Sequence, residues 1–266
     1  MIREWAWVRY GIPDILTDET MHPFEYRSIM GMTIFGDERD SMHFEVLTED
    51  RSGGIVIETL MRRLLDPTLS DYSVSVRPHR GKGDIPSNPF ARPDRFASGL
   101  MDLLPAKLRA YDRICAGTDF VLVVVLDSDY FLPDEVHQNL RSLCSQFAPG
   151  IRHVIGICVE ETESWLLADQ KALLSAYPDA NVSVLHNYVQ DSVCGTWEVL
   201  CQVLLAERAN ALIRVGYPAI GQFKHEWAQN ISRHMDPKRN VSPSFLRFSH
   251  ELMITAMSQT QSGVRS

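Results

Sequence analysis

The chain has 266 residues, 45% of them apolar and 23% charged, which is the composition of an ordinary globular protein. This length suits one large α/β domain, or one such domain with a helical extension. The formal net charge of −8 argues against a protein that holds nucleic acid through its overall charge, because such proteins are usually basic. Any contact with phosphates would therefore depend on local basic residues and on bound metal.

Apolar runs and cysteines bear on the compartment. No stretch approaches the roughly 18 apolar residues that a membrane span needs, and no apolar signal segment follows Met1-Ile-Arg-Glu4. The cysteines are odd in number, scattered and without zinc-ligand spacing, so we expect buried free thiols. They are Cys115, Cys144, Cys158, Cys194 and Cys201. The prediction is a cytoplasmic protein with no membrane partner.

The first regular element begins near residue 43. Residues 1–42 carry scattered aromatic side chains without a lasting helical or strand period, so we expect an irregular N-terminal extension. Residues 43–48 predict a core strand, and the apolar spacing over 54–65 predicts an amphipathic helix. Glu49 therefore lies at the strand-to-helix turn, where a metal or an anion could bind. The alternative is an acid of a surface loop.

A short alternating strand over 72–76 leads into the basic, glycine-containing segment Arg77–Gly83. Arg80 and Lys82 flank Gly81 in this segment, which could bind phosphate although the full P-loop pattern is absent. An exposed basic turn is the alternative. The proline-rich residues 85–95 predict a loop.

The apolar run Phe120–Leu126 predicts a strand buried on both faces, as in a parallel sheet covered by helices. A helix over 98–115, kinked or restarted at Pro105, precedes it. Asp127 and Asp129 follow the run directly. Ligands of open α/β sheets bind beyond the carboxyl ends of the strands. Two carboxylates there repel each other unless a cation lies between them, so we expect Mg²⁺ or Mn²⁺; the alternative is a pair of solvated loop acids.

The next elements continue the alternation of strands and helices. Pro133 opens a helix that ends at Pro149-Gly150, and 153–159 predicts a further buried strand. This order predicts a parallel sheet with right-handed crossovers. Glu163 follows the strand and could bind the same metal, or could merely complement the dipole of a helix running to about Tyr177.

The rest of the chain predicts helices over 195–206, over 218–235 and from Ser242 onward. Ser242 before a proline is a good N-cap. Lys224, in the second of these helices, could reach a phosphate; an exposed helix surface is the alternative. Asp169, in the helix before them, is expected on the surface or as a partner on the helix face.

These elements divide the chain into three parts: an extension (1–42), an α/β core (43–177) and a helical part packed on the core (178–266). The fold class is α/β, with a Rossmann-like parallel sheet of about four strands flanked by helices.

Glu49 after the first strand and Asp127-Ser-Asp129 after a later buried strand resemble the TOPRIM superfamily. This superfamily is the catalytic domain of topoisomerases, primases and overcoming-lysogenization-defect nucleases. More closely, the chain is similar to a TOPRIM-like family of small bacterial proteins often found near phage-defence genes. This likeness covers roughly residues 43–255, and it also rests on Arg80–Gly83, Glu161–Asp169 and Ser242–Phe245. Asp50 departs from the family's usual glycine, and its side chain could crowd the site or add a ligand.

The resemblance implies a TOPRIM-like catalytic core that hydrolyses phosphodiester bonds with Mg²⁺ or Mn²⁺. Glu49, Asp127 and Asp129 would hold the metal, with Glu163 as a further ligand. Glu49 could instead act as the general acid or base.

Basic residues would stabilise charge on the phosphate: Lys82 with help from Arg80, and Lys224. No tyrosine is clearly placed as a topoisomerase nucleophile, so hydrolysis is favoured over strand transfer. The implied partners are nucleic acid, DNA ahead of RNA, together with a defence-system protein and further copies of this chain.

Two other functions remain open. A nucleotide-sugar transferase also carries Asp-x-Asp after an apolar strand, but it would leave Glu49 without a role. A non-catalytic, metal-binding regulatory or partner subunit of a defence or toxin system is compatible with Asp50 and with the acidic charge. A haloacid-dehalogenase-type phosphatase is disfavoured, because its Asp-x-Asp usually follows the first strand.

Overall fold

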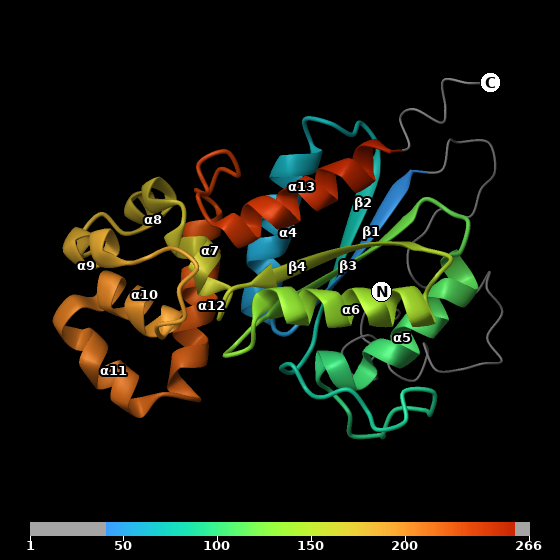
Figure 1. Cartoon of the computed structure of the whole chain (residues 1–266). Coiled ribbons are helices and arrows are strands. Elements are labelled where there is room, and N and C mark those ends of the chain that lie inside the picture. Colours follow the sequence, from blue (N-terminus) through green and yellow to red (C-terminus); the bar gives the residue numbers. More distant parts are fainter. Residues whose placement is uncertain (1–40, 259–266) are drawn as a thin grey trace, which may run out of the picture.

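A computed structural model describes residues 41–258. Its centre is a sheet of four parallel strands in the order β2-β1-β3-β4. The strands are β1 (Met42–Thr48), β2 (Tyr72–Pro78), β3 (Phe120–Asp127) and β4 (Arg152–Cys158). The predicted α/β fold with a parallel sheet and C-terminal helices is confirmed (Figure 1).

Helices cover both faces of the sheet (Figure 1). One face carries α4 (Arg51–Leu65) and α13 (Pro243–Met257), and the other carries α5 (Leu100–Cys115) and α6 (Pro133–Phe147). β3 is buried on both faces because its side chains alternate between two apolar clusters: Val121 and Val123 face the first pair of helices, and Leu122 and Val124 the second.

The remaining helices gather at the end of the sheet where the strands finish (Figure 1). They are α7 (Glu163–Leu167), α8 (Gln170–Ala176), α9 (Val182–Asn187), α10 (Thr196–Leu205), the 3₁₀ turn η1 (Ala206–Arg208), α11 (Ala209–Val215) and α12 (Ala219–Ser232). Ser242 caps α13 by accepting from the N–H of Phe245 at 3.1 Å, so the predicted cap is confirmed. Among residues 41–258, no helix is long and apolar enough to cross a membrane.

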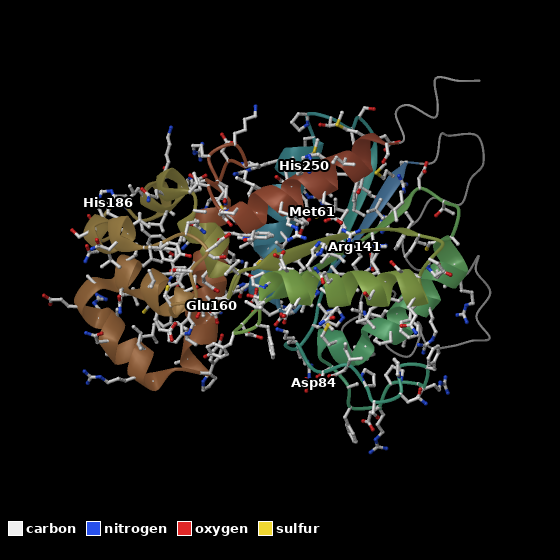
Figure 2. All side chains as sticks on the ribbon, in the orientation of Figure 1. Met61, Asp84, Arg141, Glu160, His186 and His250 are labelled. Atoms are coloured by element: carbon white, nitrogen blue, oxygen red, sulfur yellow. The ribbon has the colours of Figure 1, made fainter. Side chains whose placement is uncertain are left out.

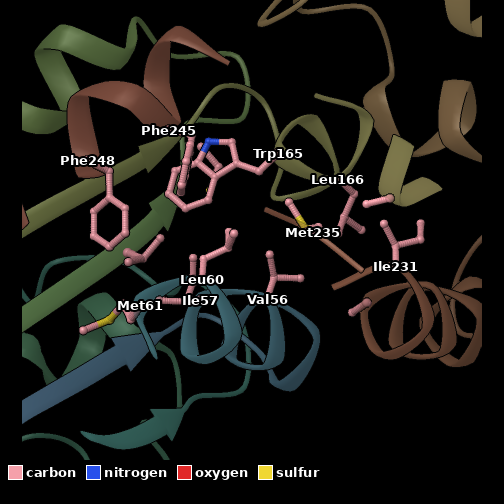
Figure 3. Close-up of a cluster of buried hydrophobic side chains, with 14 of the residues drawn as sticks. Val56, Ile57, Leu60, Met61, Trp165, Leu166, Ile231, Met235, Phe245 and Phe248 are labelled. Carbon is pink, nitrogen blue, oxygen red and sulfur yellow. The ribbon is translucent and has the colours of Figure 1, made fainter. Parts of the chain in front are cut away.

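One apolar cluster joins the sheet to these helices (Figure 3). The Trp165 ring of α7 stacks on Phe248 and meets Phe245 edge-on, and its indole N–H donates to Ser244 Oγ at 2.9 Å. Leu60 of α4 lies in the same cluster. The helical part therefore shares the core of the sheet, because the buried apolar residues of 178–258 belong to this same cluster.

Several local expectations were wrong. α5 does not restart at Pro105, because the helix continues through this residue; a kink there stays a prediction. The helix expected to run to Tyr177 is two helices, because the Asp169 carboxylate caps the second by accepting from Ala172 N–H at 3.0 Å. Asp169 is only 1% exposed and pairs with Arg239 at 2.9 Å, so it is not a surface acid. Cys194 is exposed, unlike the other cysteines. The predicted extension at 1–42 lies outside the described residues, except that Met42 belongs to β1.

Candidate functional site

Glu49 and Asp127 meet at the carboxyl end of the sheet. β1 and β3 are hydrogen-bonded parallel neighbours, so the residues that follow them emerge at one edge. Glu49 Oε1 accepts the backbone N–H of Asp127 at 2.8 Å. The two acids, far apart in the sequence, therefore lie side by side, as the strand-end argument predicted.

Lys82 ties the basic loop to the same edge. Its ammonium donates to the Asp127 carbonyl at 2.8 Å and to the Asp129 carboxylate at 2.6 Å. The loop backbone is fixed on both sides, because Gly81 N–H donates to the Glu49 carbonyl at 2.9 Å and Met101 N–H donates to the Lys82 carbonyl at 2.7 Å. The Lys82 side chain therefore reaches the site from a loop whose backbone is fixed by hydrogen bonds, and not from a free surface turn.

Glycine is required in this loop for conformation and for space. Gly81 and Gly83 have φ of +90° and +63°, values that side chains rarely adopt. A Cβ on Gly83 would also lie 2.6 Å from the Asp102 carboxylate. Arg80, in contrast, is exposed, and its side chain makes no ion pair with any residue in 41–258. Phosphate binding by Arg80 therefore stays a prediction.

A second acidic group comes from the segment after β4. Thr162 Oγ1 donates to Asp127 Oδ1 at 2.9 Å, which fixes this segment against the first acids. The Lys224 ammonium lies 3.1 Å from Glu163 Oε2 and 3.5 Å from Glu161 Oε1. Lys224 is only 6% exposed, so it is not on a helix surface. As placed, it neutralises carboxylates, and its role toward phosphate stays a prediction.

Burial strongly perturbs the acids. Burial raises the pKa of Glu49 to about 7, although the hydrogen bond from Asp127 N–H and the charge of Lys82 oppose this. Burial, with Glu49 as a neighbouring charge, raises the pKa of Asp127 well above its ordinary value. Burial also raises the pKa of Glu161 to about 7. For Lys224, burial favours the neutral amine, but Glu163, Glu161 and Asp127 outweigh it, so its pKa is raised. Perturbed groups gathered at one place are typical of functional sites.

The donor set suits a hard cation, but it is not assembled as a coordination sphere. Among residues 41–258, no group of three or more His, Cys, Asp or Glu side chains is arranged to hold a metal ion. Instead, Lys224 lies near both Glu161 and Glu163, and Lys82 pairs with Asp129. Even so, Glu161 Oε2 is buried without a hydrogen-bond partner, and Glu163 Oε2 meets Lys224 without a well-directed hydrogen bond. Oxygen-only donors of this kind fit Mg²⁺ or Mn²⁺.

A cavity of about 10 Å³ lies among Asp50, Asp127, Glu163 and Lys224. This is close to the smallest space that holds one water molecule. The Asp50 carboxylate both lines this cavity and caps α4 by accepting from Gly53 N–H at 2.7 Å.

The sequence predicted neither a role for Thr162 nor the pairing of Glu163 with Lys224. The acidic segment 160–163 after a buried strand pointed to Thr162 and Glu163, but nothing in the local sequence pointed to Lys224 on α12. No family model and no curated protein matches this chain.

Proposed function

We propose that this chain is a metal-dependent nuclease that hydrolyses phosphodiester bonds in nucleic acid, with DNA preferred over RNA. The observation that carries the proposal is the contact between Glu49 and Asp127 N–H at 2.8 Å, beside the Lys82–Asp129 pair at 2.6 Å. Acids and a lysine at the carboxyl edge of a parallel sheet are what phosphoryl transfer needs. The resemblance to TOPRIM nucleases, and a role in anti-phage defence, belong to this proposal.

Glu49, Asp127 and Asp129 would hold Mg²⁺ or Mn²⁺, with Glu163 as a further ligand. Bound there, the cation would lower the pKa of a water molecule and neutralise charge on the phosphate. Lys82 would turn from Asp129 toward the phosphate oxygens and stabilise the negative charge that develops on them.

Glu49 could instead transfer protons. In the metal-free protein, burial raises its pKa to about 7, so both protonation states are present near neutral pH. If it does not bind the metal, it could take a proton from the attacking water or return one to the leaving oxygen.

Competing functions make different demands on these residues. A non-catalytic regulatory or partner subunit is supported by one observation: Lys82 and Lys224 already neutralise Asp129 and Glu163, as in a purely structural network. A nucleotide-sugar transferase would need no acid at Glu49, so the close contact between Glu49 and Asp127 weighs against it.

The test is incubation of the purified chain with supercoiled plasmid, single-stranded DNA and RNA, in Mg²⁺, Mn²⁺ or EDTA. We expect cleavage with metal and none in EDTA. Asp127→Ala should abolish it, whereas Asp134→Asn, a change at an exposed acid on α6, should not. Cleavage that persists in EDTA or in Asp127→Ala would contradict the proposed mechanism, and no cleavage of any substrate would favour the partner-subunit function.

A further inference from the structure

A cavity of about 280 Å³ adjoins the acidic site. It lies between the segment that follows β3 and the start of α10, and its wall includes Asp129, Tyr130, Glu161, Val193, Trp197 and Glu198. Figure 2 shows Glu160, which also lines it, where β4 meets the C-terminal helices. The volume is near the lower limit of about 300 Å³ for small-molecule pockets. It has room for one nucleobase, but not for a base pair with its backbones.

The wall offers apolar and aromatic surface. Tyr130 follows Asp129 directly and is 90% exposed, which leaves a large ring uncovered beside the acids. Val193 is 52% exposed on the opposite segment, and Trp197 of α10 also borders the cavity. Bases stack on exposed aromatic rings of this kind.

Most of the negative charge around the cavity is already compensated. The Glu160 carboxylate accepts backbone N–H groups at the start of α10, from Gly195 and Thr196, each at 2.9 Å. Asp129 is paired with Lys82, and Glu161 Oε1 lies near Lys224. A nucleotide approaching this cavity would therefore not face four free carboxylates.

Two carboxylate oxygens near the wall do not add a contact for a ligand. Glu161 Oε2 and Glu198 Oε2 are buried and have no hydrogen-bond partner among residues 41–258. Because they are buried, they do not face the cavity and give no preference among the bases. The aromatic surface of Tyr130 is the feature of the wall that a base would contact.

We propose that this cavity takes an unpaired base of the substrate, next to the phosphate held at Asp127 and Asp129. The inference rests on the proposed nuclease function and makes the substrate single-stranded. Tyr130 is the stacking residue.

The test uses the full chain and measures binding by fluorescence anisotropy with Ca²⁺ in place of Mg²⁺, and cleavage in Mg²⁺. The probes are a labelled oligothymidylate and the same oligonucleotide paired with its complement. The variants are Tyr130→Ala and Tyr130→Phe. Phe96→Ala, at an aromatic residue that is 75% exposed and does not line the cavity, is the control.

We expect the wild type to bind the single strand better than the duplex. Tyr130→Ala should weaken single-strand binding about tenfold, the loss of one stacked base, while Tyr130→Phe keeps it. Phe96→Ala should change nothing.

The two proposals fail separately. Cleavage by the wild type with no effect of Tyr130→Ala on single-strand binding overturns the base site and leaves the nuclease standing. Binding that depends on Tyr130 without any cleavage supports the base site and overturns hydrolysis. Failure to bind every probe overturns both.

Discussion

Replacing Lys224 with methionine should destabilise the protein and make it depend on a divalent cation. The Lys224 ammonium is buried and lies 3.1 Å from Glu163 and 3.5 Å from Glu161. Methionine keeps most of the apolar stem, so the change isolates the loss of charge. Removing one partner from a buried ion pair typically costs about 3–5 kcal/mol, because the remaining charge is left uncompensated.

A cation that binds only the folded protein would restore part of this loss. At a free concentration about 100-fold above its Kd, the gain is about 2.7 kcal/mol. We therefore expect Lys224→Met to lose about 3–5 kcal/mol of unfolding free energy in EDTA and to regain about 3 kcal/mol in Mg²⁺ or Mn²⁺. The wild type should gain less, because its lysine already occupies the space between the acids.

The assay is urea unfolding followed by tryptophan fluorescence, with and without metal. Lys171→Met, at an exposed lysine on α8, is the matched control and should behave as the wild type. The reasoning is refuted if Lys224→Met unfolds at the same urea concentration as the wild type in EDTA, or if metal stabilises both proteins equally.

Three further predictions concern single carboxylates. Glu49→Gln should stabilise the metal-free protein at pH 8 by up to roughly 3 kcal/mol, because folding disfavours the ionised Glu49 carboxylate. This figure corresponds to the difference between a pKa of about 7 in the native state and the ordinary 4.5. Urea unfolding at pH 8 and pH 4 should show the gain only at the higher pH. Glu45 behaves oppositely: burial raises its pKa, but the hydrogen bond from His43 and the charge of Arg77 outweigh this effect, so the pKa is lowered. The contribution of Glu45 to stability is therefore present above the ordinary pKa of 4.5 and is lost as pH falls through the lowered value. Glu45→Gln should therefore be less stable than the wild type at pH 7, and the gap between their melting temperatures should narrow below pH 4.5; a constant gap would contradict this. Asp102→Ala removes the carboxylate that accepts N–H groups at 2.9 and 3.0 Å from both ends of the 84–99 loop. It should cost about 1 kcal/mol of unfolding free energy, and in steady-state cleavage it should lower kcat more than it changes KM. An unchanged kcat would mean that the loop needs no such anchor.

The sheet was predictable because a strand that is buried on both faces has an apolar sequence of its own. The run Phe120–Leu126 is apolar throughout since both its faces are covered, and that alone predicts an interior parallel strand. Parallel strands present their carboxyl ends at one edge of a sheet, which is why Glu49 and Asp127, each directly at the end of its strand, lie close together. The glycines around Lys82 likewise mark the turn of the basic loop, and phosphate binding by this loop stays a prediction.

What could not be predicted depends on contacts between distant residues. The spacing of apolar residues in α12 indicates which side of the helix is buried. It does not indicate that Lys224 is buried against Glu163. Asp169 caps α8 and is buried, and its charge is compensated by Arg239, a residue far along the chain. Side-chain periodicity carries no information about such pairs.

The measurement that tests the central claim most directly is the cleavage rate of Glu49→Gln at saturating Mn²⁺, on whichever nucleic acid the wild type cuts. Glu58→Gln, the same substitution at a half-exposed glutamate of α4 that pairs with Arg62, is the control. If Glu49 transfers a proton or holds the metal, its variant should cut at least about a hundredfold more slowly than Glu58→Gln while still binding the substrate. Equal rates for the two variants would contradict the assignment of this edge of the sheet as the catalytic site.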